Sequence, residues 1–207
     1  MTKMLSVATL TVMCALSAMP AVAQQRPPSP DAHAATQVGG HYIGADPLYV
    51  DGKWIEISYG GPIKRSRDLW GSGATYGRML MNGAPVWRAG ADISTYLMTE
   101  TTLVINGKTI APGGYTMFID LKPGKWTLIV SNWEPQKQFN PGDRTRLWGS
   151  FGYTPDKDVA RVAMKIDKFP LAVDELTWNF ADVTPTGGKL VLQWDTVVAS
   201  APFTVTN

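Results

Sequence analysis

The stretch LVINGKTIAPGGYTMFIDLKPGKWTLIVS, residues 103–131, decides the fold class of this chain. Short apolar runs alternate in it with pairs of turn-forming residues, Asn106-Gly107, Pro112-Gly113 and Pro123-Gly124. Asparagine followed by glycine is the strongest short signal of a β-hairpin, because both residues tolerate a positive φ. The stretch therefore predicts a series of short strands that return antiparallel to one another.

The same texture extends in both directions from this stretch. Apolar residues recur at every second position from Ile55 to Tyr59, and again in the segments 160–166 and 190–194. No segment after the N-terminal region holds a helical period for more than about two turns. Strands spaced by about 8–12 residues are typical of an antiparallel sandwich or barrel. We predict an all-β protein with a single antiparallel β-sandwich domain, jelly-roll-like, over residues 45–207.

Residues 1–23 have the layout of a cleaved secretory signal peptide. Lys3 supplies a short basic segment, an apolar stretch runs from Met4 to Ala18, and Ala21-Val22-Ala23 forms an A-x-A cleavage site. Cleavage after Ala23 predicts a periplasmic or secreted protein. The apolar stretch is too short to span a bilayer, and no later run reaches the roughly 18 apolar residues of a membrane span. We therefore expect no membrane span.

The segment that follows, residues 24–44, differs in composition from the domain. It is rich in Pro, Ala and Gln, and it contains the run Arg26-Pro27-Pro28-Ser29-Pro30. Such a segment has little apolar surface to bury and cannot offset the entropy of ordering its backbone. We interpret residues 24–44 as a flexible linker.

Cysteine content and charge limit how the mature chain is stabilised and what it binds. The single cysteine, Cys14, lies inside the predicted signal peptide, so the mature chain has no disulfide framework. The full chain has 19 basic and 17 acidic residues, and cleavage removes only Lys3 from this balance. Nucleic-acid binding requires a clustered basic stripe, and the sequence has none. We therefore expect no nucleic-acid partner.

Several motifs together resemble one known family. Ile57-Ser58-Tyr59-Gly60-Gly61-Pro62 leads into Arg65-Ser66-Arg67-Asp68-Leu69-Trp70-Gly71, and the string W-R-x-G-A-D follows at Trp87–Asp92. With Ala111-Pro112-Gly113-Gly114-Tyr115 and the closing Trp194-Asp195, this pattern is similar to the DUF2911 family of exported bacterial proteins over roughly Ile55 to Val205. The resemblance implies a β-rich exported fold and no particular chemistry.

The sequence contains none of the common catalytic motifs: no H-E-x-x-H, G-x-S-x-G or S-x-x-K pattern and no glycine-rich phosphate loop. His33 and His41 are the only histidines, and two histidines without cysteine make a poor zinc set. We therefore assign no catalytic residue, no metal ligand and no cofactor. Asp182 and Asp195 each lie near a strand end and are expected to face one another if the chain is a hydrolase that uses paired carboxylates.

The better candidates for a site are arginines beside tryptophans in the family-like strings. Arginine forks onto carboxylates or phosphates and stacks on indoles, which suits a pocket for an anionic or polar ligand. The alternative is structural, with Arg88 as the buried partner of Asp92 and Trp87 in the core. The residues that we nominate for ligand binding are Arg65, Arg67, Trp70, Trp87, Arg88, Asp92 and Trp133.

The loop from Trp133 to Tyr153 carries several aromatic residues among Gly, Pro and Asn. Aromatic residues on loops bind ligands by stacking, but a disulfide-free sandwich also needs large side chains to close its ends. We predict that Trp148 and Phe151 plug the sandwich while Trp133 faces solvent beside the site.

These observations favour a non-catalytic exported module that binds a small polar or carbohydrate-like ligand. An envelope-directed hydrolase and a structural or assembly protein of the cell envelope are the alternatives. The sequence determines neither the ligand nor the oligomeric state.

Overall fold

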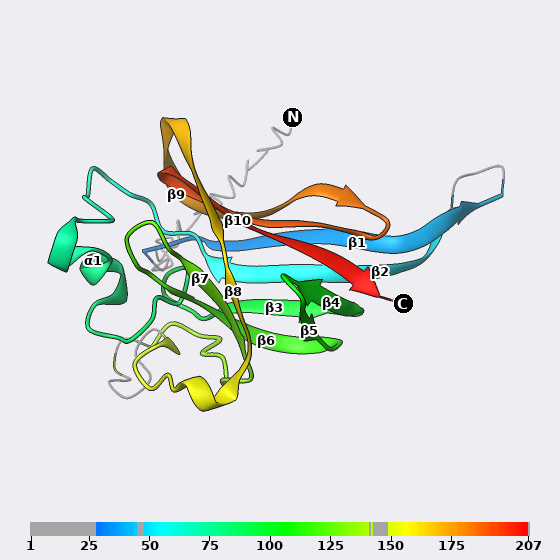
Figure 1. Ribbon diagram of the computed structural model, residues 1–207, viewed down its shortest axis with the longest axis horizontal. Helices are drawn as coiled ribbons and strands as arrows, with labels where there is room; N and C mark the ends of the chain where they lie inside the picture. Colours follow the sequence, from blue (N-terminus) through cyan, green and yellow to red (C-terminus); the bar gives the residue numbers. More distant parts are fainter. Residues whose placement is uncertain (1–27, 45–47, 141, 143–148, 207) are drawn as a thin grey trace, which may run out of the picture.

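The structure is a computed structural model that describes residues 28–44, 48–140, 142 and 149–206 (Figure 1). The predicted signal peptide and Trp148 lie outside the described residues. The elements are, in order, β1 (Asp31–Ile43), β2 (Leu48–Gly60), a 3-10 turn (Gly73–Thr75), α1 (Arg78–Met81), β3 (Thr95–Thr99), β4 (Thr102–Ile105), β5 (Lys108–Ile110), β6 (Gly113–Asp120), β7 (Thr127–Ser131), a second 3-10 turn (Pro155–Lys157), β8 (Asp158–Ala163), β9 (Lys165–Thr184) and β10 (Gly187–Thr206).

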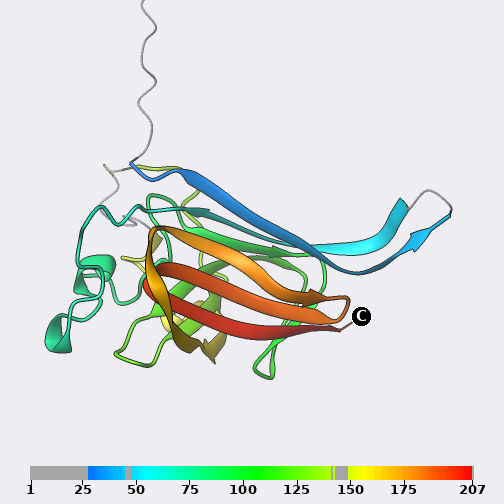
Figure 2. The same ribbon diagram turned by 90° about the horizontal axis from the view of Figure 1, so that it is seen from above.

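The strands form two antiparallel sheets that pack face to face, as the sequence predicted. One sheet has six strands in the order β1-β2-β3-β6-β7-β8, and the other has the order β5-β4-β10-β9. Figure 2 shows β1 and β2 in one layer and β9 and β10 in the other. The Asn106-Gly107 signal is confirmed, because Leu103 pairs with Ile110 and Ile105 with Lys108 across that turn. The all-β sandwich is therefore the observed fold class.

The period-two pattern of β2 decides which side chains enter the core. Ile55, Ile57 and Tyr59 are buried between the sheets, because alternate side chains of a strand point to opposite faces. Trp54 and Glu56 lie on the other face, which is called here the outer face of the six-stranded sheet. Large residues from both sheets fill the interior, and the bulkiest fully buried ones are Trp87, Trp126, Trp178, Trp194 and Phe118.

Strand β1 corrects the prediction of a flexible linker over residues 24–44, because residues 31–43 of that segment form a strand. Residues 31–43 pair antiparallel with β2 from Asp31 opposite Gly60 to Ile43 opposite Leu48. The core-facing positions of β1 are mostly small and show no strong apolar period, and within β1 only Val38 is fully buried. Backbone pairing with β2 orders this segment. The β1–β2 hairpin extends beyond the rest of the sandwich (Figure 1).

Strand β10 reverses its direction partway along. Asp195 has a φ of 53°, and the register with β9 shifts on both sides of it. The two halves of β10 then lie side by side, since Val205 N donates a hydrogen bond of 2.9 Å to Thr186 O beside the strand's start. The second half also pairs with β4, with Phe203 opposite Ile105. The bend brings Asp195 to the end of the sandwich that segment 61–94 covers.

Candidate functional site

The two arginines of the first family-like string hold a turn at the end of β2. Arg67 donates from Nε to Lys64 O at 2.9 Å and from Nη2 to Ile63 O at 2.6 Å. Arg65 is exposed and has a φ of 48°, and its Nη2 lies 3.4 Å from Pro28 O. These contacts fix the backbone where the chain leaves β2. They leave the nominated ligand role of Arg65 and Arg67 as a prediction.

Trp70 and Trp87 belong to a cluster of four indoles at one end of the sandwich. Trp87 stacks on Trp194 with ring centroids 6.1 Å apart, and Trp70 lies 4.9 Å from Trp126. Trp126 Nε1 donates to the Tyr76 hydroxyl at 2.8 Å, which satisfies a buried polar group. Burial of this much aromatic surface indicates that the cluster closes the core.

An ion pair ties segment 61–94 to the bend in β10. Lys64 Nζ lies 2.5 Å from Asp195 Oδ1, and Trp70 Nε1 donates to Asp195 Oδ2 at 3.2 Å. Asp182, in contrast, pairs with Lys189 at 2.5 Å. Lys189 precedes Asp195 by six residues, or about 20 Å of extended strand. The prediction that Asp182 and Asp195 face one another as paired carboxylates is therefore wrong.

The W-R-x-G-A-D string is held by hydrogen bonds to β3, to β9 and to the chain that precedes β1. Ala89 O accepts hydrogen bonds from Trp178 Nε1 at 2.9 Å and Thr95 Oγ1 at 3.1 Å. Asp92 is buried and its Oδ2 accepts from Ser29 N at 2.9 Å, which ties the chain before β1 to the body. Ala89 and Asp92 both have a positive φ, at 57° and 62°. These bonds explain how the string holds an unfavourable backbone in place.

Arg88 is half-buried and lies in the same string. Its Nε donates to Gly90 O at 3.1 Å. Burial lowers the pKa of Arg88 to about 9, and the nearby Asp92 carboxylate acts in the opposite direction by favouring the charged guanidinium. The geometry therefore supports the structural interpretation of Arg88, with Asp92 as an electrostatic neighbour.

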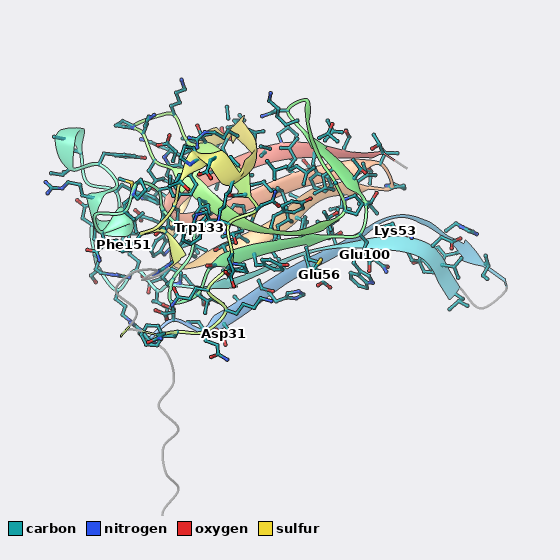
Figure 3. The ribbon with its side chains drawn as sticks, turned by 90° about the horizontal axis from the view of Figure 1, so that it is seen from below. Asp31, Lys53, Glu56, Glu100, Trp133 and Phe151 are labelled. Atoms are coloured by element: carbon teal, nitrogen blue, oxygen red, sulfur yellow. The ribbon has the colours of Figure 1, made fainter. Side chains whose placement is uncertain are left out.

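Trp133 corrects another prediction, because its side chain is only 8% exposed. It packs edge-on against Phe118, with ring centroids 6.3 Å apart, in a second small core on the outer face. Thr116 Oγ1 donates to Trp133 O at 2.6 Å and holds the chain there as it leaves β7. Phe151 is half-buried nearby (Figure 3). The loop after β7 thus folds back over the sheet, which covers the indole.

One edge of this loop borders a surface pocket of about 580 Å³. Ser94 N donates to Gln136 O at 2.9 Å and Gln136 N donates to Ser94 Oγ at 2.8 Å, so the loop is anchored beside the start of β3. Trp133 is the one nominated residue among the described residues that line it. The lining residues are Tyr96, Trp133, Glu134, Pro135, Gln136, Lys137, Gln138 and Asn140.

Tyr96 forms the aromatic wall of the pocket, and Gly114 of β6 determines how its ring lies. A Cβ atom at Gly114 would meet the Tyr96 hydroxyl oxygen at 1.7 Å and Cζ at 2.5 Å. The ring therefore lies down on the sheet across the glycine and does not stand away from it. Lys137 Nζ is 5.7 Å from the ring centroid, within the range of a cation–π contact.

Sequence reasoning missed Tyr96, Gln136 and Lys137. The available signal was the alternation in β3, where Thr95, Leu97 and Thr99 are buried and Tyr96 points outward. Five residues are too few for this period to stand out, and no motif marks the loop. The place of the ring depends on Gly114, whose proximity follows only from the pairing of β3 with β6.

The described residues contain no group of three or more His, Cys, Asp or Glu side chains placed to hold a metal ion. Within the same residues, no helix is long and apolar enough to cross a membrane. Fold and pocket together define a β-sandwich protein with an aromatic-walled surface pocket. The chain belongs to the DUF2911 family, described as a protein of unknown function, and the match covers residues 47–203. Comparisons with curated proteins and with solved structures find no match.

Proposed function

We propose that this protein is an exported, non-catalytic module that binds a small polar, carbohydrate-like ligand in the pocket beside Tyr96. The observation that carries the proposal is the Tyr96 ring, which lies flat across Gly114 at the pocket wall. A flat aromatic ring beside a polar cavity offers an apolar face and a hydrogen-bonding rim together. A sugar ring presents the complementary surface, with apolar C–H groups on its faces and hydroxyls at its edge.

The other lining residues suit hydroxyl groups. Gln136, Gln138 and Asn140 each carry an amide that both donates and accepts hydrogen bonds, as a hydroxyl does. Lys137 adds donors 5.7 Å from the centroid of the Tyr96 ring. Such planar polar side chains around one ring fix the orientation of a ligand, whereas the aromatic contact supplies apolar burial.

The composition of the pocket argues against the hydrolase alternative. Glycoside hydrolysis uses two carboxyl groups at a fixed separation on either side of the scissile bond. Among the described residues that line the pocket, Glu134 is the single carboxylate. A second acid at this place is therefore lacking in the described part of the chain, which favours binding over hydrolysis.

The test compares ligand binding by two variants of the protein without its predicted signal peptide. Thermal shift against glucose, N-acetylglucosamine, galactose and their disaccharides identifies a ligand, because binding to the folded state raises Tm. Titration calorimetry with that sugar should show affinity at least about tenfold weaker for Tyr96→Ala, equivalent to about 1.4 kcal/mol. Phe169→Ala, at a 39% exposed aromatic residue of β9, is the matched control and should bind normally.

Two results would contradict the proposal. One is the absence of a Tm shift with every sugar, and the other is equal affinity of Tyr96→Ala and the Phe169→Ala control.

A further inference from the structure

The outer face of the six-stranded sheet continues beyond the pocket along β2 and β3. Tyr96 pairs with Ser58, and Met98 pairs with Glu56, so all four side chains lie on this face. Trp54 comes two residues before Glu56 on β2 and therefore points the same way. An open row of side chains thus leads from the pocket toward the β1–β2 hairpin. Figure 3 shows its direction, from Trp133 at the loops to Glu56 and Glu100 farther along the sheet.

Trp54 is the aromatic residue at the far end of this row. It is 43% exposed, which is unusual for an indole on a well-paired strand. Two hydrogen bonds to Glu100 fix its backbone, because Trp54 N donates to Glu100 Oε2 at 2.8 Å and Glu100 N donates to Trp54 O at 2.9 Å. The exposed ring therefore stands on a rigid strand.

The two aromatic residues are separated by a distance that suits a chain and not a single ring. Ser58, the partner of Tyr96, is four residues from Trp54, or about 13 Å along β2. Glu56 and Met98 lie between them, and His33 of β1 borders this part, with Nε2 3.8 Å from Glu56 Oε2. The row therefore alternates aromatic or apolar surface with groups that bind hydroxyls.

We infer that the ligand of this face is a linear oligosaccharide that contacts Tyr96 and Trp54 at the same time. This inference rests on the proposed function of the pocket. One sugar unit stacks on Tyr96, further units pass over Met98 and Glu56, and a later unit stacks on Trp54. Two such contacts on one rigid face act on a single ligand, so the affinity gained at Trp54 requires a ligand long enough to reach it.

The experiment measures affinity as a function of ligand length. The probes are β-1,4-linked oligomers of N-acetylglucosamine and of glucose, from one to six units, titrated into the protein without its predicted signal peptide. For the series that binds, affinity should rise with length until both aromatic residues are reached and then level off. Trp54→Ala should lower the affinity for the hexamer about tenfold, while leaving the affinity for the monosaccharide unchanged. Tyr96→Ala should lower both.

Tyr42→Ala is the control, because Tyr42 is 68% exposed on the same hairpin but lies outside the row. A second measurement needs no substitution: iodide quenching of tryptophan fluorescence should decrease with the hexamer and stay constant with the monosaccharide. If the monosaccharide binds through Tyr96 but affinity is independent of length and of Trp54, this inference fails and the proposed function stands. If no oligomer of either series binds, both fail.

Discussion

The contact between Tyr96 and Gly114 gives the sharpest test of the site geometry. In Gly114→Ala, the new Cβ atom would lie 1.7 Å from the Tyr96 hydroxyl oxygen, so the ring must move off the sheet. Forcing extra volume into a packed contact costs about 1–3 kcal/mol. Alanine in a strand also regains about 0.5–1 kcal/mol relative to glycine. The net loss of unfolding free energy should therefore be between about 0 and 2.5 kcal/mol.

The same substitution should act in the opposite direction when the ring is absent. In a Tyr96→Ala background the clash disappears, and Gly114→Ala should stabilise the protein by about 0.5–1 kcal/mol. The four proteins form a double-mutant cycle with a coupling free energy of about 1–3 kcal/mol. In a Tyr96→Phe background the effect of Gly114→Ala on the unfolding free energy should be intermediate, because this background lacks the hydroxyl oxygen but keeps the ring carbon at 2.5 Å.

Urea denaturation of the four proteins, followed by fluorescence, measures this coupling from the shifts of the midpoint at constant slope. Equal effects of Gly114→Ala in both backgrounds would show that the ring does not rest on the glycine. The flat aromatic wall, and with it the basis of the pocket proposal, would then be lost.

The ion pair at the β10 bend and the buried hydroxyl of Tyr153 give two further predictions. Asp195→Asn should lower the unfolding free energy by about 2–3 kcal/mol in urea, because it leaves the half-buried Lys64 without its charged partner. Asp182→Asn breaks the exposed pair with Lys189 and should lower the unfolding free energy much less, so equal losses would contradict a stabilising role of the Lys64–Asp195 ion pair. Burial raises the pKa of Tyr153 above its ordinary value of 10, and the Asp158 carboxylate, which accepts a 2.7 Å hydrogen bond from the Tyr153 hydroxyl, adds to this shift. The folded state therefore keeps a proton that the unfolded state releases, and stability falls as pH rises above 10. Denaturation between pH 9 and pH 12 should show a shallower fall for Tyr153→Phe, and an unchanged slope would refute this assignment.

The sequence predicted the fold where local chemistry is decisive. The Asn106-Gly107 turn has φ values of 46° and 75°, which few other residue pairs tolerate. Its hairpin can therefore be predicted from the sequence without any tertiary information. The alternation in β2 is equally plain, because one face of the strand is buried. β1 was missed, because small core-facing residues at 32–36 resemble a linker and only pairing with β2 makes them a strand.

The candidate site was harder to predict because residue type does not distinguish a ligand pocket from a set of contacts that stabilise the fold. Arginine and tryptophan in the family-like strings suit both, and in the structure they hold a turn and close the core. Asp195 is likewise compatible with a catalytic or a structural role, and in the structure it pairs with Lys64 instead of facing Asp182. Trp133 was expected in solvent because its neighbours are polar, but the loop after β7 covers the sheet. The pocket itself depends on β3–β6 register and on loop conformation, which no local pattern encodes.

The bend in β10 has a consequence for how the chain reaches its native state. The β9–β10 turn joins residues that are near in sequence, Thr184 and Gly187, so this hairpin closes quickly. The pairing of Phe203 with Ile105 instead joins segments nearly a hundred residues apart, and closing such a loop is slow. Until it closes, β4 presents an open edge that can pair with another molecule. The reversal at Asp195 therefore governs how long this aggregation-prone edge stays uncovered during folding.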